Sequence, residues 1–165
     1  MRTSVYIETT IPSYIVANPS RHDYERGCQE RTREWWDNQR GDYDLCISQV
    51  VLSEVGQGDA QMAAKRLELL QDIPELDLNE EVETLTTALM DCGALPPAAA
   101  RDAAHIAATC VYRIDILLTW NCKHIANPHI QRQLKKVIEN HGYEMPVLCT
   151  PDQLRTSEDD HELES

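Results

Sequence analysis

The sequence of 165 residues has no hydrophobic run that approaches the roughly 20 residues needed to cross a membrane. It also lacks a glycine-rich phosphate loop, because its six glycines are dispersed and form no GxGxxG pattern. The first residues lead directly into a strand-like segment, without the long apolar region and small-residue cleavage site of a signal peptide. We therefore expect a cytoplasmic protein without a membrane span.

Basic residues are scarce: 15 lysines and arginines face 28 acidic residues, which gives a formal net charge of −13. Because non-specific binding of nucleic acid depends on basic side chains that neutralise phosphates, this balance excludes a broad nucleic-acid binder. It does not exclude an enzyme that acts on RNA, since a carboxylate cluster that holds a cation adds negative charge. Residues 155–165 form an acidic tail with almost nothing to bury, which we expect to be flexible.

The six cysteines include no CxxC pair, and several lie in apolar stretches. In a reducing cytosol they are expected to be small buried hydrophobic side chains, although pairing is possible in principle. A zinc site formed by Cys122, His124 and His129 is possible by residue type, but the spacing matches no standard structural zinc pattern.

Short apolar runs alternate with helical periodicity along residues 1–154. Strands are expected at about 4–7, 44–47, 75–78, 116–118 and 145–148. The polar residues that are expected to cap the intervening helices are Ser20, Ser48, Asp59, Asn79 and Asn127. Short buried strands separated by helices predict a single domain over residues 1–154, a three-layer α/β/α sandwich with a central parallel sheet of about five strands.

Polar side chains lie where open α/β sheets bind ligands, just beyond the carboxyl ends of the strands. Glu8 follows the first strand, and Glu54 lies on the helix that leaves the second. Asp102 is the only acidic residue of an alanine-rich helix, in its first turns. Asn121 follows the strand at 116–118. Four oxygen-bearing side chains are therefore expected to converge at one edge of the sheet.

Each of these four residues also has a purely structural interpretation. Glu8 can be a solvating charge at a strand edge, and Glu54 can face solvent on its helix. Asp102 can favour the helix dipole near an N-terminus, and Asn121 can be a simple turn residue. Taken separately the signals are weak, so the prediction depends on the common location of the four residues.

Four segments resemble the signature blocks of the PIN domain, in the right order and at domain-scale spacing. They are VYIETTIPS at 5–13, ISQVVLSE at 47–54, ARDAAHIA at 100–107 and DILLTWN at 115–121. Within that family the sequence is most similar to VapC-type toxins of bacterial and archaeal toxin–antitoxin pairs. The resemblance spans residues 5 to about 154, nearly the whole chain.

The resemblance implies a metal-dependent ribonuclease whose metal ligands are Glu8, Glu54 and Asp102. Glu8 stands where the family usually has aspartate, and the family's fourth acidic position falls on the neutral Asn121. Thr119 matches a hydroxyl residue commonly found two positions before the fourth one. Three carboxylates suit one Mg²⁺ or Mn²⁺ ion, because such hard ions take oxygen ligands and keep several waters. The missing charge disfavours a second ion and leaves a catalytically inactive PIN-fold module, which binds RNA or a protein partner, as the alternative.

Phosphodiester hydrolysis needs an activated water and neutralisation of the phosphate charge, both of which a divalent ion supplies. Asn121 is expected to orient a metal-bound water or the scissile phosphate. Lys123 and His124 follow it and either contact the RNA backbone or are solvated. His105 lies one helix turn after Asp102, so it is either a donor to a metal ligand or a buried histidine bonded to backbone.

The expected partners are an RNA substrate and a cognate antitoxin protein, and a homodimer is also open. In the resembled family a partner protein often lies over the early helices, which places an antitoxin near Trp36. Trp35 and Trp36 can stack on a base, but a core or partner-binding role is more common for such a pair. Three arginines form either a basic rim or a solvated charged face: Arg21, Arg26 and Arg33.

Overall fold

A parallel sheet of five strands lies at the centre of the computed structural model, which describes residues 2–154. The strands are β1 (Ser4–Ile7), β2 (Asp44–Ser48), β3 (Glu75–Leu76), β4 (Ile116–Leu118) and β5 (Val147–Cys149). Their order is β3-β2-β1-β4-β5, so the first strand of the chain is the middle strand of the sheet. On that strand Tyr6 pairs with Cys46 on one side and with Leu117 on the other.

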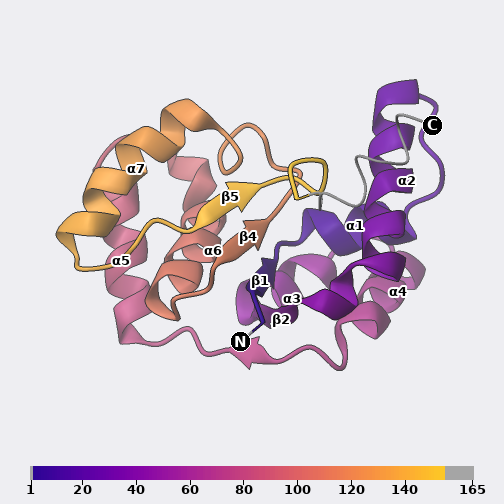
Figure 1. The fold of residues 1–165 in the computed structure, drawn as a ribbon, viewed down its shortest axis with the longest axis horizontal. Helices are drawn as coiled ribbons and strands as arrows, with labels where there is room; N and C mark the ends of the chain where they lie inside the picture. Colours follow the sequence, from indigo (N-terminus) through magenta and orange to yellow (C-terminus); the bar gives the residue numbers. More distant parts are fainter. Residues whose placement is uncertain (1, 155–165) are drawn as a thin grey trace.

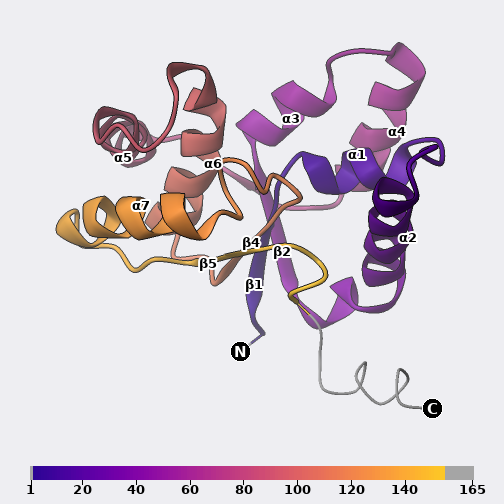
Figure 2. The ribbon, with the colours of Figure 1, turned by 90° about the horizontal axis from the view of Figure 1, so that it is seen from above.

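Seven α-helices flank the sheet in the part of the chain that the structure describes (Figure 1). They are α1 (Thr10–Val16), α2 (Asp23–Asn38), α3 (Gln49–Val55), α4 (Ala60–Leu70), α5 (Glu80–Asp91), α6 (Ala100–Val111) and α7 (Pro128–Asn140). Figure 2 shows α1, α2 and α4 on one side of the strands and α5, α6 and α7 on the other. The predicted three-layer α/β/α sandwich with a five-stranded parallel sheet is therefore confirmed.

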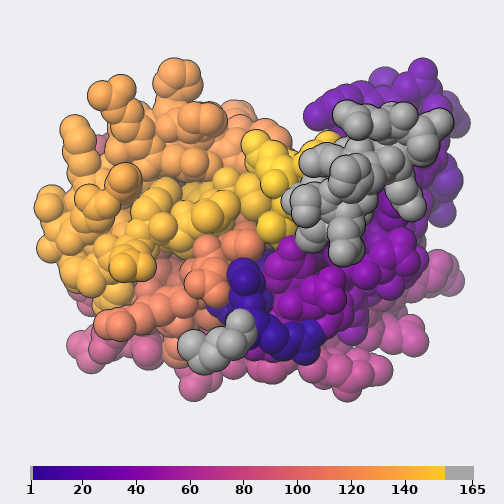
Figure 3. All heavy atoms as spheres, viewed as in Figure 1, coloured from indigo at the N-terminus to yellow at the C-terminus, as the bar shows by residue number. Residues whose placement is uncertain are grey.

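The core fills the space between the sheet and both helix layers. Val5, Tyr6 and Ile7 of β1 are all 0% exposed, as expected for a central strand that is covered on both faces. Trp35 and Trp36 are buried in this core, so the core role predicted as the more common one is confirmed and stacking on a base is excluded. In the space-filling view of Figure 3, early residues of the chain, in purple, and late residues, in orange, lie on the two sides of the start of β1, in indigo.

Four of the five predicted helix caps are confirmed, because the side-chain oxygen of each accepts a hydrogen bond from a backbone N–H in the first helical turn. These caps are Ser48, Asp59, Asn79 and Asn127. The prediction for Ser20 is wrong, since α2 begins only at Asp23 and His22 stands at its cap position. The Ser20 hydroxyl instead accepts the N–H of His22, a local turn that competes with helix formation.

Two strands differ in length from the prediction. β3 stops at Leu76 because its partner strand β2 ends at Ser48, where α3 begins. β5 starts at Val147 instead of residue 145, since Pro146 has no N–H to donate to the sheet. The N–H of Val147 makes the first bond of this strand, to the carbonyl of Asp115.

The structure also bears on the predictions for the cysteines, the arginines of α2 and the membrane span. The six cysteines are free, and all but Cys92 and Cys122 are buried, as predicted for small hydrophobic side chains. Arg26 forms an ion pair with Asp23, whereas Arg33 donates to backbone carbonyls at the end of α1. Within residues 2–154 no helix is long and apolar enough to cross a bilayer. The predicted flexible tail at 155–165 lies outside the described residues.

Candidate active site

The four residues singled out in the sequence lie beyond the carboxyl ends of the central strands. Glu8 follows β1, Glu54 lies near the end of α3, Asp102 lies in the first turn of α6, and Asn121 lies in the turn after β4. In Figure 2 the strands run upward from the N-terminus, so this edge of the sheet is at the top of the view, near α1, α3 and the start of α6. A series of hydrogen bonds connects Glu8, Asn121 and Asp102, and Glu54 has a separate set of partners, as described below.

Glu8 is a buried carboxylate, only 3% exposed, and three donors hold it. Its Oε1 accepts hydrogen bonds from the Thr10 N–H at 2.9 Å, from the Thr10 hydroxyl and from the Thr119 hydroxyl at 2.8 Å. Such bonds compensate the cost of burying a charged group. Because all three go to Oε1, the other carboxylate oxygen takes no part in holding the side chain. The solvating role considered for Glu8 is therefore excluded.

Glu54 is oriented by Thr9, which lies between β1 and α1, and by His105 of α6. Its Oε1 accepts a hydrogen bond from the Thr9 hydroxyl at 2.9 Å and lies 2.6 Å from His105 Nε2. Burial by itself raises the pKa of this carboxyl, but His105, with smaller contributions from Thr9 and Arg101, lowers the pKa below its ordinary value. The carboxyl is therefore ionised at neutral pH.

His105 is fully buried and bonds on both sides of its ring to side chains. Its Nδ1 lies 2.7 Å from the Tyr6 hydroxyl, which lies 2.6 Å from the Ser48 hydroxyl. Burial raises the pKa of Tyr6 well above its ordinary value, so its hydroxyl keeps the proton. Of the two interpretations of His105, the structure favours the donor to a carboxylate over a histidine bonded to backbone.

Asp102 is joined to the turn after β4 through a histidine. Asp102 Oδ2 lies 2.8 Å from His124 Nδ1, and both side chains are about one-fifth exposed, at 17% and 19%. The His124 N–H donates to Asn121 Oδ1 at 3.0 Å, and the Asn121 N–H donates to the Thr119 hydroxyl at 2.9 Å. Since Thr119 also binds Glu8, one hydrogen-bond series runs from β1 through the turn to α6.

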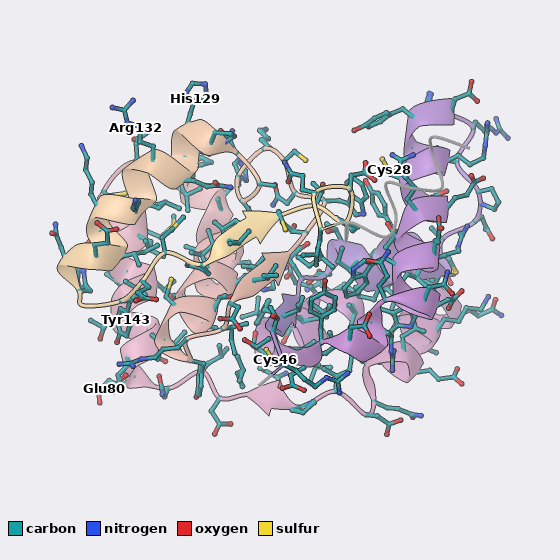
Figure 4. The ribbon with its side chains drawn as sticks, in the orientation of Figure 1. Cys28, Cys46, Glu80, His129, Arg132 and Tyr143 are labelled. Atoms are coloured by element: carbon teal, nitrogen blue, oxygen red, sulfur yellow. The ribbon has the colours of Figure 1, made fainter. Side chains whose placement is uncertain are left out.

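Asn121 therefore has the simple turn role that the sequence allowed, because its side-chain oxygen holds the backbone of His124. Lys123 lies exposed in the same turn, which is compatible with both of its interpretations. The proposed zinc residues do not form a site: His124 bonds to Asp102, whereas Cys122 is exposed. Figure 4 shows His129 pointing outward from the start of α7.

The chemistry of the donor set fits a hard divalent cation, since Glu8, Glu54 and Asp102 offer carboxylate oxygens from three segments at one edge of the sheet. Among residues 2–154, however, no three histidine, cysteine or acidic side chains are arranged as a formed metal site. In the arrangement described, Glu54 is bound to His105 and Asp102 to His124. An ion at this edge would have to use the carboxylate oxygens that these histidines leave free.

The sequence did not reveal several residues of the site. Thr9 and Thr10 bind carboxylates and Tyr6 binds His105, yet none of the three was singled out. A tyrosine in the middle of a strand buried on both faces was a usable signal, because its hydroxyl must find a partner. Trp120 was also missed: its ring stacks on Tyr14, with centroids 5.8 Å apart and planes at 12°, beside the turn that carries Asn121.

Comparison with solved structures finds this fold in another protein. The match is to a chain in the crystal structure of VapBC2 from Rickettsia felis bound to a DNA fragment from their promoter, with a TM-score of 0.51 and 15% sequence identity. It covers 90% of this chain and 98% of that chain. The two chains share a fold over nearly their full lengths.

A second match is to tyrosyl-tRNA synthetase from Aeropyrum pernix, with a TM-score of 0.47 and 13% identity. It covers 90% of this chain but 52% of that chain. The sequence matches no family model and no curated protein. The likeness to the VapBC2 chain supports the predicted fold, and the fold alone.

Proposed function

We propose that this chain is a metal-dependent endoribonuclease of the VapC type, the toxin of a toxin–antitoxin pair. The observation that supports this proposal is the arrangement of Glu8, Glu54, Asp102 and Asn121 at the carboxyl edge of the central strands. The likeness of the fold to a chain of a VapBC2 complex points in the same direction. Neither observation is explained by a protein whose carboxylates only solvate its surface.

Glu8, Glu54 and Asp102 would hold Mg²⁺ or Mn²⁺ directly or through water. A bound ion of this kind supplies an activated water and neutralises charge on the scissile phosphate. The protein's own contribution is to orient the ligands: Thr119 fixes one oxygen of Glu8, and His105 fixes one oxygen of Glu54. Preset ligands of this kind avoid the cost of ordering side chains when the ion binds.

RNA would approach the same edge of the sheet. Arg101 and Lys123 are exposed. Arg101 directly precedes Asp102, and Lys123 lies two residues after Asn121, so the cationic groups of both can contact the phosphate backbone of RNA. The amide of Asn121 would help to position the scissile phosphate. With a net charge of −13, such local contacts have to replace the broad basic surface of a non-specific binder.

The test is cleavage of single-stranded RNA in the presence of Mg²⁺, Mn²⁺ or EDTA. We expect metal-dependent cutting by the unaltered protein and a loss of about 100-fold or more for Asp102→Asn and Glu8→Gln, because each removes a charged ligand. Asp91→Asn, at the exposed end of α5, is the matched control and should cut normally. Undiminished cutting by both site variants would contradict the site assignment.

The alternative is a catalytically inactive PIN-fold module, and the neutral Asn121 is the observation that favours it. Such a module would bind a short RNA oligonucleotide but leave it intact with every metal tested. A binding measurement on the same RNA, made in parallel with the cleavage assay, separates this alternative from the enzyme.

An antitoxin partner is part of the proposal, with docking expected near Trp36 on the early helices. Trp36 itself is 6% exposed, and Arg40 lies over its ring at 4.3 Å. A partner would therefore contact Arg40 and exposed apolar residues of α2 and α4 such as Tyr24 and Leu67. Co-purification with the product of an adjacent reading frame tests the partner, and light scattering tests the proposed homodimer.

A further inference from the structure

Four polar side chains form a continuous hydrogen-bonded series beneath the candidate site, which we name the Glu54 tether. The tether runs from Ser48 to Tyr6 at 2.6 Å, from Tyr6 to His105 Nδ1 at 2.7 Å, and from His105 Nε2 to Glu54 at 2.6 Å. Its first three members are 0% exposed. The tether begins at the N-cap of α3, crosses β1 and α6, and returns to Glu54 near the end of α3.

Hydrogen bonds on both sides of the ring fix His105 in place. The ionised carboxylate of Glu54 only accepts, so His105 Nε2 donates to it. Nδ1 of the same ring makes the hydrogen bond to the Tyr6 hydroxyl, which is bonded in turn to Ser48, and Ser48 Oγ accepts the N–H of Val50. The ring therefore cannot turn away from Glu54 without the loss of a buried hydrogen bond.

Burial of these polar groups needs an explanation, because apolar side chains of similar size would fill the same space without a desolvation cost. Tyr6 lies on the middle strand of the sheet, where both faces are otherwise covered by apolar side chains. The Thr9 hydroxyl adds a second bond to the same Glu54 oxygen, at 2.9 Å. These contacts fix one carboxylate oxygen of Glu54 and leave the other for a ligand.

We propose that Tyr6 and Ser48 are positioning residues that fix the ring of His105 and thereby hold Glu54 ready to bind a divalent cation. This inference rests on the proposed function, because it takes Glu54 to be a metal ligand. Partners that orient metal ligands through a second hydrogen bond typically change metal affinity by roughly 10–100-fold when they are removed. Residues that contact neither RNA nor ion would thus control the affinity of the site.

The test uses the full chain with Mn²⁺ as the probe, and three variants. Tyr6→Phe removes one oxygen and keeps the ring, His105→Leu removes both ring nitrogens, and His105→Gln keeps an amide donor. Matched controls are Tyr143→Phe and His129→Gln, which Figure 4 shows on the side of the molecule that carries α5 and α7. NMR detects the hydrogen-bonded Nε2–H of His105, and titration calorimetry reports the affinity for Mn²⁺.

In the unaltered protein we expect an Nε2–H signal of His105 that exchanges slowly with water, because it is buried and hydrogen-bonded to Glu54. Tyr6→Phe should speed up that exchange and lower the affinity for Mn²⁺ about tenfold, and His105→Leu should lower the affinity on the order of 100-fold. His105→Gln should retain more of the affinity than His105→Leu, because its amide can still donate to Glu54. The two controls should bind Mn²⁺ as the unaltered protein does.

The absence of a hydrogen-bonded Nε2–H of His105 in the unaltered protein would overturn the proposal, as would full Mn²⁺ affinity in Tyr6→Phe. If Tyr6→Phe does not fold, the His105 pair decides, and equal losses for Gln and Leu would overturn it. An unaltered protein that binds no Mn²⁺ also refutes the ligand-orienting role. Binding of Mn²⁺ without cleavage of RNA, by contrast, contradicts only the ribonuclease proposal.

Discussion

Replacement of Thr119 by valine is the most direct test of how the fold supports the site. Thr119 is 0% exposed, and its hydroxyl makes two bonds: it donates to Glu8 Oε1 at 2.8 Å and accepts the Asn121 N–H at 2.9 Å. Valine has the same branched shape and suits a strand end, so packing is retained. The substitution therefore removes the two hydrogen bonds and little else.

The expected cost follows from those two bonds. A hydrogen bond to a charged group contributes about 1.5–3 kcal/mol, and an unpaired backbone N–H costs about 1–3 kcal/mol when water cannot reach it. Asn121 is partly exposed, so its contribution lies at the low end, and Glu8 keeps both donors of Thr10. We therefore expect Thr119→Val to lower the free energy of unfolding by about 2–4 kcal/mol. For a domain of this size that corresponds to a fall in Tm of roughly 5–15 °C.

Urea denaturation at neutral pH measures this change. The midpoint should fall while the slope of the transition stays constant, because the surface exposed on unfolding is unchanged. Thr87→Val is the matched control: that threonine is exposed on α5 and its hydroxyl bonds only to the carbonyl of Glu83. The control should change stability by less than about 0.5 kcal/mol. Equal effects of the two substitutions would refute the role given to Thr119.

Three further predictions follow from the same structure. Asn121→Asp adds a fourth carboxylate to the edge while keeping the acceptor for the His124 N–H. It should raise the affinity for Mg²⁺, measured by calorimetry, and lower the stability of the metal-free protein, measured by urea denaturation. Asn79→Ala removes the cap of α5 and should cost about 1 kcal/mol in urea denaturation, whereas Asn79→Ser should restore most of it. Burial raises the pKa of the Cys46 and Cys110 thiols to about 12, so at pH 8 a thiol reagent should label the two exposed cysteines in the native protein and all six after unfolding.

The fold could be predicted because its local signals agree with its topology. Four of the five strands contain a short apolar run, and four of the caps named in advance hold their helices. The strand ends could not be predicted with the same success, because a strand ends where its neighbour ends. β3 shows this: its sequence allows four residues, but β2 offers a partner to only two of them.

The sequence pointed to the carboxylates and, as supporting residues, to His105 and Thr119, but it did not reveal which carboxylate each of these two binds. A rule about the carboxyl ends of parallel strands was enough to place Glu8 and Asn121 near each other. The bonds that orient the site connect distant parts of the chain: 99 residues separate Tyr6 from His105 and 111 separate Glu8 from Thr119. Such pairings depend on the tertiary fold, and no spacing along the sequence reveals them.

The neutral residue at position 121 is consistent with the number of hydrogen-bond donors available to the carboxylates at this edge of the sheet. Each acidic side chain there has its own donor: hydroxyl groups for Glu8, His105 for Glu54 and His124 for Asp102. These donors offset the mutual repulsion of the carboxylates, so the arrangement described needs no ion to hold it together. A fourth carboxylate at Asn121 would add repulsion without an evident further donor, since the one imidazole nearby, His124, is already bound to Asp102. The amide thus favours folding before metal binding, and the affinity of the site then depends on how readily the histidines share their carboxylates with an ion.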